Sequence, residues 1–332
     1  MESEESAANK DDFLPTASWE NLRLRAELLR RLREFFHTRG FMEVETPILS
    51  ADTVVDRHLD PFYTEISSAS EMAPRRYWLQ MSPEFGMKRL LAFGAKAIYQ
   101  VSRVFRQGEL GPLHNPEFTM VEWYRVGDGM AQGMQLTSDL AQVMLGRSPA
   151  GQISYQEAFL KHVGVDPHTA DTSSLIAAAR QHNIEAPDSL SPQDRDGWLD
   201  LLLVERIQPH LGQGSPVLLY DFPASQAALS RIRNDNPPVA ERFELYVDGI
   251  ELANGYHELL DADELRRRTR ENNRLRSAEG KTTLPEESRL LAAMEAGLPP
   301  AVGVALGFDR LVMIAVGAKS LAEVMAFPFD RA

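Results

Sequence analysis

Four separated segments of the chain carry charged and polar residues where the flanking sequence predicts buried strands. They are residues 82–84, 106–122, 244–258 and 307–310. A buried charge is costly unless it is paired or meets a charged ligand, so these segments constrain the fold strongly. Taken singly, each has an ordinary explanation, because a glutamate in a strand usually lies on the solvent face. Taken together, they predict a fold in which carboxylates and arginines that are distant in sequence converge on one site.

Helical patterns frame the first of these segments. Residues 1–17 are predicted to be a disordered or extended tail, after which apolar residues recur at helical spacing until Gly40 supplies a left-handed stop. A second helix begins with Ser82 as its N-cap and Pro83 in its first turn. Glu84 is thereby predicted to lie where a strand passes into a helix.

Strand patterns account for most of the remaining core. Residues 41–49 predict a strand at an edge or interface, because Pro47 has no N–H group to donate to a neighbouring strand. Residues 97–106 and 114–126 form a hairpin-like pair, which implies an antiparallel sheet. Further strand patterns occupy residues 75–81, 216–223, 241–259 and the beginning of 303–317.

Helical patterns broken by proline and glycine occupy residues 130–215, and a long, highly charged helix is predicted at residues 262–280. We interpret residues 130–215 as a helical insertion in a single catalytic domain of residues 18–332. The predicted fold class is therefore α+β.

Charge and composition argue against several classes of function, although the net charge does not exclude a local basic patch. The formal net charge is −13, whereas proteins that bind nucleic acid through many phosphates usually present a basic surface. The absence of cysteine excludes disulfides and thiolate metal sites. The acidic first residues do not form a signal peptide, and no apolar run is long enough to span a bilayer. We therefore expect a cytoplasmic protein that makes no membrane contact.

Four stretches, FMEVETPIL, FRQGELGPLHNPEFTMVEWY, FELYVDGIELANGYHEL and GVALGFDRLVM, identify a family when they are considered together. In order and spacing they resemble the three signature motifs of class II aminoacyl-tRNA synthetases of the lysyl branch. The resemblance covers about residues 19 to 332. It implies the class II synthetase catalytic fold, an antiparallel sheet flanked by helices, with the first motif at a homodimer interface.

The resemblance also implies ATP and Mg²⁺ as cofactors, since these enzymes drive the attack of a carboxylate on the α-phosphate. Arg106 resembles the arginine that bridges that phosphate and the amino-acid carboxylate, a bidentate role for which lysine is a poor substitute. Arg310 resembles the arginine that packs on adenine opposite Phe118 and reaches the γ-phosphate. Glu244 and Glu251 resemble the carboxylates that hold Mg²⁺. The other ATP contacts that the resemblance implies are Gln107, Gly108, Glu109, His114, Asn115, Leu252 and Gly307.

Arg106, Arg310 and Glu251 are the catalytic residues that the resemblance implies. A lysine-type substrate brings two ammonium groups that need desolvated acidic partners. By resemblance, Glu84 receives the amino group near the reacting end, and Asn254 lies on the carboxylate side. The distal ammonium is surrounded by Glu122, Tyr124 and Glu258, and the substrate site is completed by Ser82, Pro83 and Ala305.

Two departures from the lysyl synthetases favour one subfamily. Fewer than about twenty residues precede the first predicted core helix, so the anticodon-binding barrel of those enzymes is missing. Ala305 stands where they have glycine, and its methyl group excludes an α-amino group in favour of a shifted one, by about 1–3 kcal/mol. Both features resemble the elongation factor P–(R)-β-lysine ligases. They imply β-lysine as substrate and a lysine ε-amine of elongation factor P as acceptor, without recognition of a tRNA anticodon.

A third departure lies in the second motif, which commonly reads R-x-E. Here the order is Arg106, Gln107, Gly108 and Glu109, which places the acid one residue late. Either Glu109 contacts the adenine amino group through a shifted loop, or backbone groups replace it.

Two alternative functions remain open from the sequence: a minimal lysyl-tRNA synthetase, and a catalytically idle paralogue that binds a lysine-like metabolite or adenylate. Aminoacylation of tRNA would favour the first. Retention of the whole phosphate and magnesium set argues against the second. Outside these motifs, His58 is interpreted as an ordinary packed or solvent-facing histidine, and the arginines at 266–268 as a solvated helix face.

Overall fold

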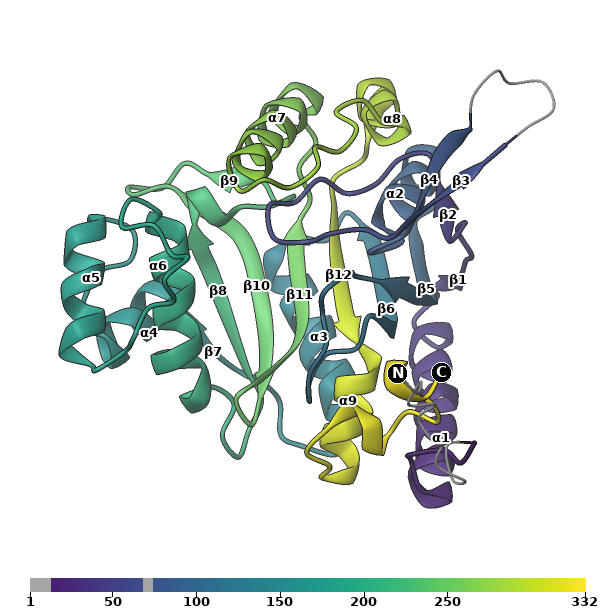
Figure 1. Cartoon of the computed structure of the whole chain (residues 1–332). Coiled ribbons are helices and arrows are strands. Elements are labelled where there is room, and N and C mark those ends of the chain that lie inside the picture. Colours follow the sequence, from purple (N-terminus) through teal and green to yellow (C-terminus); the bar gives the residue numbers. More distant parts are fainter. Residues whose placement is uncertain (1–12, 68–73) are drawn as a thin grey trace, which may run out of the picture.

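The computed structural model describes residues 13–67 and 74–332. Its centre is a large mixed sheet with the strand order β1-β5-β6-β12-β11-β10-β8-β7, in which β9 also pairs with β10 (Figure 1). These strands are β1 (Met42–Glu43), β5 (Ala97–Phe105), β6 (Glu117–Val126), β7 (Gly151–Ser154), β8 (Val217–Pro223), β9 (Ile232–Arg233), β10 (Val239–Val247), β11 (Ile250–His257) and β12 (Ala301–Gly307). A smaller sheet is formed by β2 (Leu49–Ser50), β4 (Arg75–Leu79) and β3 (Tyr63–Ile66).

The centre of the large sheet is antiparallel, from β5 through β6, β12, β11 and β10 to β8. The predicted hairpin of β5 and β6 is confirmed, with Gln100 opposite Glu122. Only the two edges are parallel within the described residues, where β1 pairs with β5 and β7 with β8. The predicted α+β class is confirmed, and the sheet is mixed because of these edge strands.

The single strand predicted for residues 41–49 is wrong. The segment forms β1 at the edge of the large sheet and then β2 in the smaller one, with Pro47 in neither. Val44 still donates to the Tyr99 carbonyl at 2.9 Å, after which the chain leaves the large sheet. Proline has no N–H group for a sheet, so the change of partner occurs next to it.

Helices cover both faces of the large sheet (Figure 1). A core that includes Phe36, Leu140, Phe243 and Phe308 joins α1, α3 and α9 to one face. A second core joins α4, α5 and α6 to β8 and β10, and a third joins α2, α7 and α8 to β5 and β6. The helices are α1 (Trp19–His37), α2 (Glu84–Ala92), α3 (Met130–Leu145), α4 (Tyr155–His162), α5 (Thr172–Gln181), α6 (Arg195–Leu202), α7 (Ala262–Ala278), α8 (Arg289–Gly297) and α9 (Phe308–Val316).

Shorter helical segments complete the chain: a π-helical turn at Leu203–Ile207 and 3₁₀ turns at Gln208–His210, Ala224–Gln226, Leu321–Glu323 and Phe329–Arg331. None of the helices in the described ranges is long and apolar enough to cross a membrane.

Local capping sets where the site-bearing helix begins. The structure starts α2 at Glu84 with Pro83 as N-cap, one residue later than predicted for Ser82. Ser82 still acts at this end, because its Oγ accepts a hydrogen bond from the Glu84 N–H at 3.0 Å. Glu84 therefore lies in the first turn of a helix that directly follows β4, as the sequence predicts.

The range 130–215 is divided among the cores. Its first helix, α3, contributes Met134, Leu136 and Leu140 to the main core, and β7 joins the large sheet. The helices α4, α5 and α6 form the separate second core beside β8 (Figure 1). Of the predicted tail, residues 1–12 lie outside the described residues, whereas the Thr16 N–H donates to the Ala326 carbonyl at 3.0 Å.

Candidate active site

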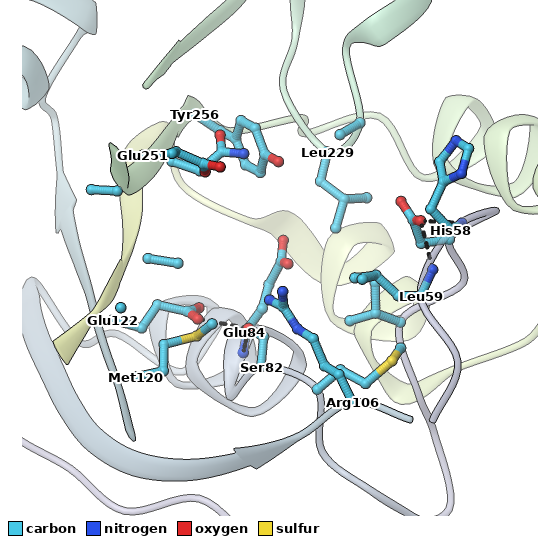
Figure 2. A pocket seen from close by; sticks show the side chains of 18 of the residues that line it. His58, Leu59, Ser82, Glu84, Arg106, Met120, Glu122, Leu229, Glu251 and Tyr256 are labelled. Carbon is cyan, nitrogen blue, oxygen red and sulfur yellow. Dashed lines mark hydrogen bonds between the residues drawn. The ribbon is translucent and has the colours of Figure 1, made fainter. Parts of the chain in front are cut away.

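One cavity of about 570 Å³ lies above β6, β11 and β12, between α2, α6 and α7. The four polar segments meet there, and Figure 2 shows Glu84, Arg106, Glu122 and Glu251 reaching into the same space from different elements. The sequence-predicted residues that line it are Ser82, Glu84, Arg106, Glu109, His114, Asn115, Phe118, Glu122, Tyr124, Glu251, Leu252, Asn254, Glu258, Ala305, Gly307 and Arg310.

Four predicted site residues do not line the cavity: Pro83, Gln107, Gly108 and Glu244. Pro83 caps α2, and the Gln107 N–H donates to the Asp60 carbonyl at 2.8 Å. Gly108 has a φ of +82°, a left-handed conformation that favours glycine in this loop. Glu244 is buried behind the cavity, where Arg242 and the Tyr246 hydroxyl bind its carboxylate.

The register of three strands aligns the floor of the cavity. Ala305 on β12 lies between Glu122 on β6 and Asn254 on β11. Two pairs further along, Gly303 lies opposite Tyr124. A Cβ atom at Gly303 would come within 2.2 Å of the Tyr124 ring and 2.3 Å of Glu258 Oε1. Glycine at this position is therefore what allows the tyrosine and the carboxylate to approach.

Three carboxylates gather at one end of the cavity. Glu122 accepts hydrogen bonds from the Ser82 hydroxyl and from the Tyr124 hydroxyl, each at 2.6 Å. Glu84 and Glu258 both contact the ammonium group of Lys88, each at 2.5 Å. All three glutamates are buried. The sequence reasoning missed Lys88, although its spacing of four residues from Glu84 on one helix is a signal for such a pair.

Burial makes two of these carboxylates, those of Glu122 and Glu258, hard to ionise. Desolvation, together with the nearby Glu84, raises the pKa of Glu122 to about 7, against the Ser82 and Tyr124 hydrogen bonds that lower it. Burial also raises the pKa of Glu258, since Lys88 offsets only part of the cost and Glu84 and Glu122 repel its charge. This end of the cavity is thus short of positive charge and suited to a cationic ligand.

Arginines and aromatic groups form a second set of lining residues. Arg106 lies over the Phe118 ring, 5.1 Å from its centroid, and 3.4 Å from Glu109. Arg310 donates to the carbonyls of Leu113 and Glu251 at 3.1 and 3.0 Å, and lies 2.8 Å from His114 Nε2. Burial and the Arg310 charge lower the pKa of His114, so its neutral ring accepts this hydrogen bond.

Glu251 is the acidic group of this arginine-rich region. Burial and the neighbouring Glu244 raise its pKa to about 7, against the attraction of Arg310, Arg242 and Arg106. Within the described part of the chain, its carboxylate makes none of the hydrogen bonds or ion pairs found for Glu244. A carboxylate that is partly desolvated and open to the cavity is able to bind a cation.

A segment that we call the strap, residues 54–59, closes one side of the cavity. Arg57 joins it to Asp194 beside α6 and to Glu279 beside α7, each at 2.5 Å. The buried Arg276 donates to the carbonyls of Asp56 and Leu59, each at 2.8 Å. His58, on this strap, is solvent-exposed and also lines the cavity (Figure 2).

Sequence reasoning also missed the wall that α6 provides. Asp196 and Asp200 line the cavity, where they accept hydrogen bonds from Ser225 at 2.6 Å and Gln226 at 2.7 Å. Burial raises the pKa of Asp200 to about 6. No sequence motif indicated Asp196 and Asp200, because they lie in the helical range 130–215, to which no function was assigned from the sequence.

Comparisons with known proteins identify the same family that the sequence motifs indicated. The family model described as tRNA synthetases class II (D, K and N) matches residues 12–331. The chain is 48% identical over 318 residues to a Salmonella typhi protein, and 46% identical to one from Salmonella arizonae (strain ATCC BAA-731 / CDC346-86 / RSK2980). Each alignment covers 96% of this chain and 98% of the relative, and each relative is named elongation factor P–(R)-β-lysine ligase.

Proposed function

The chain belongs to the class II tRNA synthetases (D, K and N) and to the elongation factor P–(R)-β-lysine ligases among them, and from this premise we propose its reaction. It activates (R)-β-lysine with ATP as an aminoacyl-adenylate and ligates it to a lysine ε-amine of elongation factor P. The observation that carries this proposal is the cavity itself, which is lined both by three buried carboxylates and by Arg106 and Arg310.

In the first step, a carboxylate oxygen of the amino acid bonds to the α-phosphorus of ATP and pyrophosphate leaves. Arg106 holds both reacting anions with its planar guanidinium, which reduces their repulsion and orients them. Adenine stacks on Phe118, and Arg310 covers its other face and reaches the γ-phosphate. The fixed carbonyl contacts of Arg310 support this role, because they hold its side chain in place before ATP binds.

The amino acid lies along the floor of the cavity. Its distal ammonium pairs with Glu122 and Glu258, and its other amino group pairs with Glu84. Ser82 and Tyr124 position Glu122 for this contact. Asn254 lies on the carboxylate side of the substrate. The Ala305 methyl group takes the space that an α-amino group would need, which favours a β-amino acid.

The acidic residues also fit Mg²⁺, which neutralises the phosphate charge when it is bound. Glu251 is the direct ligand that we propose, since its carboxylate is open to the cavity. Glu244 lies behind Glu251 and is paired with Arg242. We propose that it binds the ion directly only if ATP binding breaks this pair. Within the described residues, no group of three or more His, Asp or Glu side chains forms a metal site by itself. ATP oxygens and water therefore complete the coordination shell.

In the second step, the acceptor amine attacks the carbonyl carbon of the adenylate, and AMP leaves. The amine first loses a proton, which the phosphate of the departing AMP is able to accept. We propose no contact with a tRNA anticodon, which the net charge of −13 supports. Elongation factor P acts in translation, so we also propose a cytoplasmic location.

We further propose a homodimer. The first-motif segment leaves Met42, Ile48 and Leu49 exposed beside the edge strand β1, and exposed apolar side chains of this kind favour a protein interface. Sedimentation of the purified protein is expected to give a dimer, and Ile48→Glu is expected to shift it towards monomer. A monomeric wild type would contradict this part of the proposal.

Pyrophosphate exchange tests the first step. The wild type is expected to exchange pyrophosphate into ATP when (R)-β-lysine is present, and less efficiently with (S)-β-lysine or α-lysine. The second step is tested by a gain in mass of elongation factor P in the complete reaction. Exchange that prefers α-lysine, or aminoacylation of tRNA without modification of elongation factor P, would overturn the proposal.

A further inference from the structure

Lys88 is a fully buried cation that none of the proposed steps uses. It lies on α2, 2% exposed, and it does not line the cavity. Its ammonium group contacts Glu84 on its own helix and Glu258 at the end of β11, each at 2.5 Å. The two carboxylates come from segments more than 170 residues apart, about half the chain. Lys88 therefore joins, from behind, two groups to which the proposed function assigns the substrate amines.

The charges in this pocket do not balance without a ligand. Glu84, Glu122 and Glu258 supply three carboxylates, and Lys88 supplies one ammonium group. Two negative charges remain when all are ionised, and among the described residues Glu122 has only the Ser82 and Tyr124 hydroxyls as hydrogen-bond donors. Buried charges that are not matched are expensive. A ligand with two ammonium groups would match them.

We propose that Lys88 is a positioning residue that sets the specificity of the pocket for a diamine. It holds the carboxylates of Glu84 and Glu258 in place, and when all of these groups are ionised it leaves a residual charge that a diammonium substrate satisfies and a monoamine does not. This inference deepens the proposed function and rests on it, because that function supplies the substrate class.

The alternative is that Lys88 only forms a structural ion pair. The pH dependence of substrate binding distinguishes this role from the positioning role. The groups that face the Lys88 pocket are Glu84 on α2, Glu122 and Tyr124 on β6, Tyr256 on β11, and Glu258 directly after β11. Without the ammonium group, Glu258 loses the positive charge that favours its ionised form, so it holds its proton to higher pH. Substrate binding then requires a higher pH, a change that a structural pair would not cause.

The test measures pyrophosphate exchange with (R)-β-lysine and with 3-aminohexanoic acid, which lacks the distal amine. Lys88→Met keeps the apolar stem and removes the charge, whereas Lys88→Arg keeps the charge. Arg89→Met is the matched control, because it removes a cation from the next, exposed position of the same helix. Should Lys88→Met fail to fold, Lys88→Gln removes the charge and keeps a hydrogen-bond donor.

Lys88→Met is expected to raise the KM for β-lysine about tenfold or more at pH 7, and to move its pH dependence upward. Its preference for β-lysine over the monoamine should fall by a similar factor, while the KM for ATP changes less than about twofold. Lys88→Arg should recover most of the binding, and Arg89→Met should match the wild type.

A folded Lys88→Met or Lys88→Gln protein with the wild-type KM, pH profile and amine preference would overturn the inference. So would equal losses for ATP and β-lysine, which indicate a structural role. If the wild type itself shows no exchange, the proposed function fails. The inference is then tested separately by calorimetric measurement of β-lysine binding to the wild type and to Lys88→Met, in which weaker binding to the variant supports it and equal binding contradicts it.

Discussion

Arg106 is a single residue whose geometry, and not only its charge, matters to the proposed chemistry. Arg106→Lys keeps the positive charge but loses the planar fork that binds a phosphate and a carboxylate together. We expect pyrophosphate exchange to fall roughly a hundredfold in kcat/KM, the usual cost of removing one transition-state donor.

The control for this change is Arg103→Lys, because Arg103 is exposed on β5, the strand that ends just before Arg106, and pairs with Glu117 outside the cavity. It should leave the rate unchanged. An Arg106→Lys enzyme within about threefold of the wild type would remove Arg106 from the catalytic set.

Ala305 is the residue that we propose to separate the α- and β-amino substrates. Its methyl group lies between Glu122 and Asn254 in the strand register. Ala305→Gly should move the ratio of kcat/KM for α-lysine over β-lysine upward by about 5- to 150-fold, which corresponds to roughly 1–3 kcal/mol. Ala301→Gly, on the same strand but outside the cavity lining, should leave the ratio unchanged. A ratio unaltered by Ala305→Gly would assign the selectivity to another residue.

Individual site residues were predictable where a motif named them, and were missed where only packing reveals them. Arg106, Glu122 and Arg310 line the cavity as their motifs indicated. In the sequence Lys88 resembles a surface lysine, because no local pattern indicates that the fold brings Glu258, the residue after β11, into contact with it. The reverse holds for Glu244, which the motif places at the metal but which Arg242 holds behind the cavity wall.

Among the elements, the strap and α7 depend on one buried arginine. Arg276 on α7 donates to two strap carbonyls and to the Thr282 carbonyl, and it pairs with Asp60 at 2.6 Å. Arg276→Met leaves these acceptors unsatisfied, so we expect a loss of roughly 3 kcal/mol in the free energy of unfolding. Chemical denaturation measures this loss.

The matched substitution on the same helix is Arg274→Met. Arg274 makes an exposed pair with Glu271, and a pair of that kind contributes little to stability. Equal effects of the two substitutions would show that the strap does not depend on Arg276.

Element prediction succeeded where the pattern was long and failed where a short segment changes partner. The charged helix α7 and the strand and helix at the C-terminal end, β12 and α9, follow their patterns closely. Residues 41–49 do not, because two short strands pair with different sheets on either side of Pro47. Such a division depends on strands that arrive later in the chain, β4 and β5, and is therefore invisible in the local sequence.

For the whole molecule, buried charge in the cavity should appear as a pH dependence of stability. Burial raises the pKa of Glu122 to about 7 and raises that of Glu258, so between their ordinary values and these higher ones the folded chain binds more protons than the unfolded chain. Stability due to these groups therefore falls as pH rises. Histidines whose pKa is lowered by burial, such as His114 and His168, act in the opposite direction, but only up to about pH 6.5.

The carboxylates should thus govern the window from about pH 6.5 to 8. We expect the free energy of unfolding of the free protein, measured with urea, to fall across this window. Added β-lysine should stabilise the protein increasingly over the same range, because its ammonium groups replace the protons. Glu122→Gln should flatten the decline in the free protein, since a neutral amide has no proton to lose. Stability that rises from pH 6.5 to 8 in the wild type would mean that the pocket is ionised without a ligand, and that Lys88 alone suffices to hold its charge.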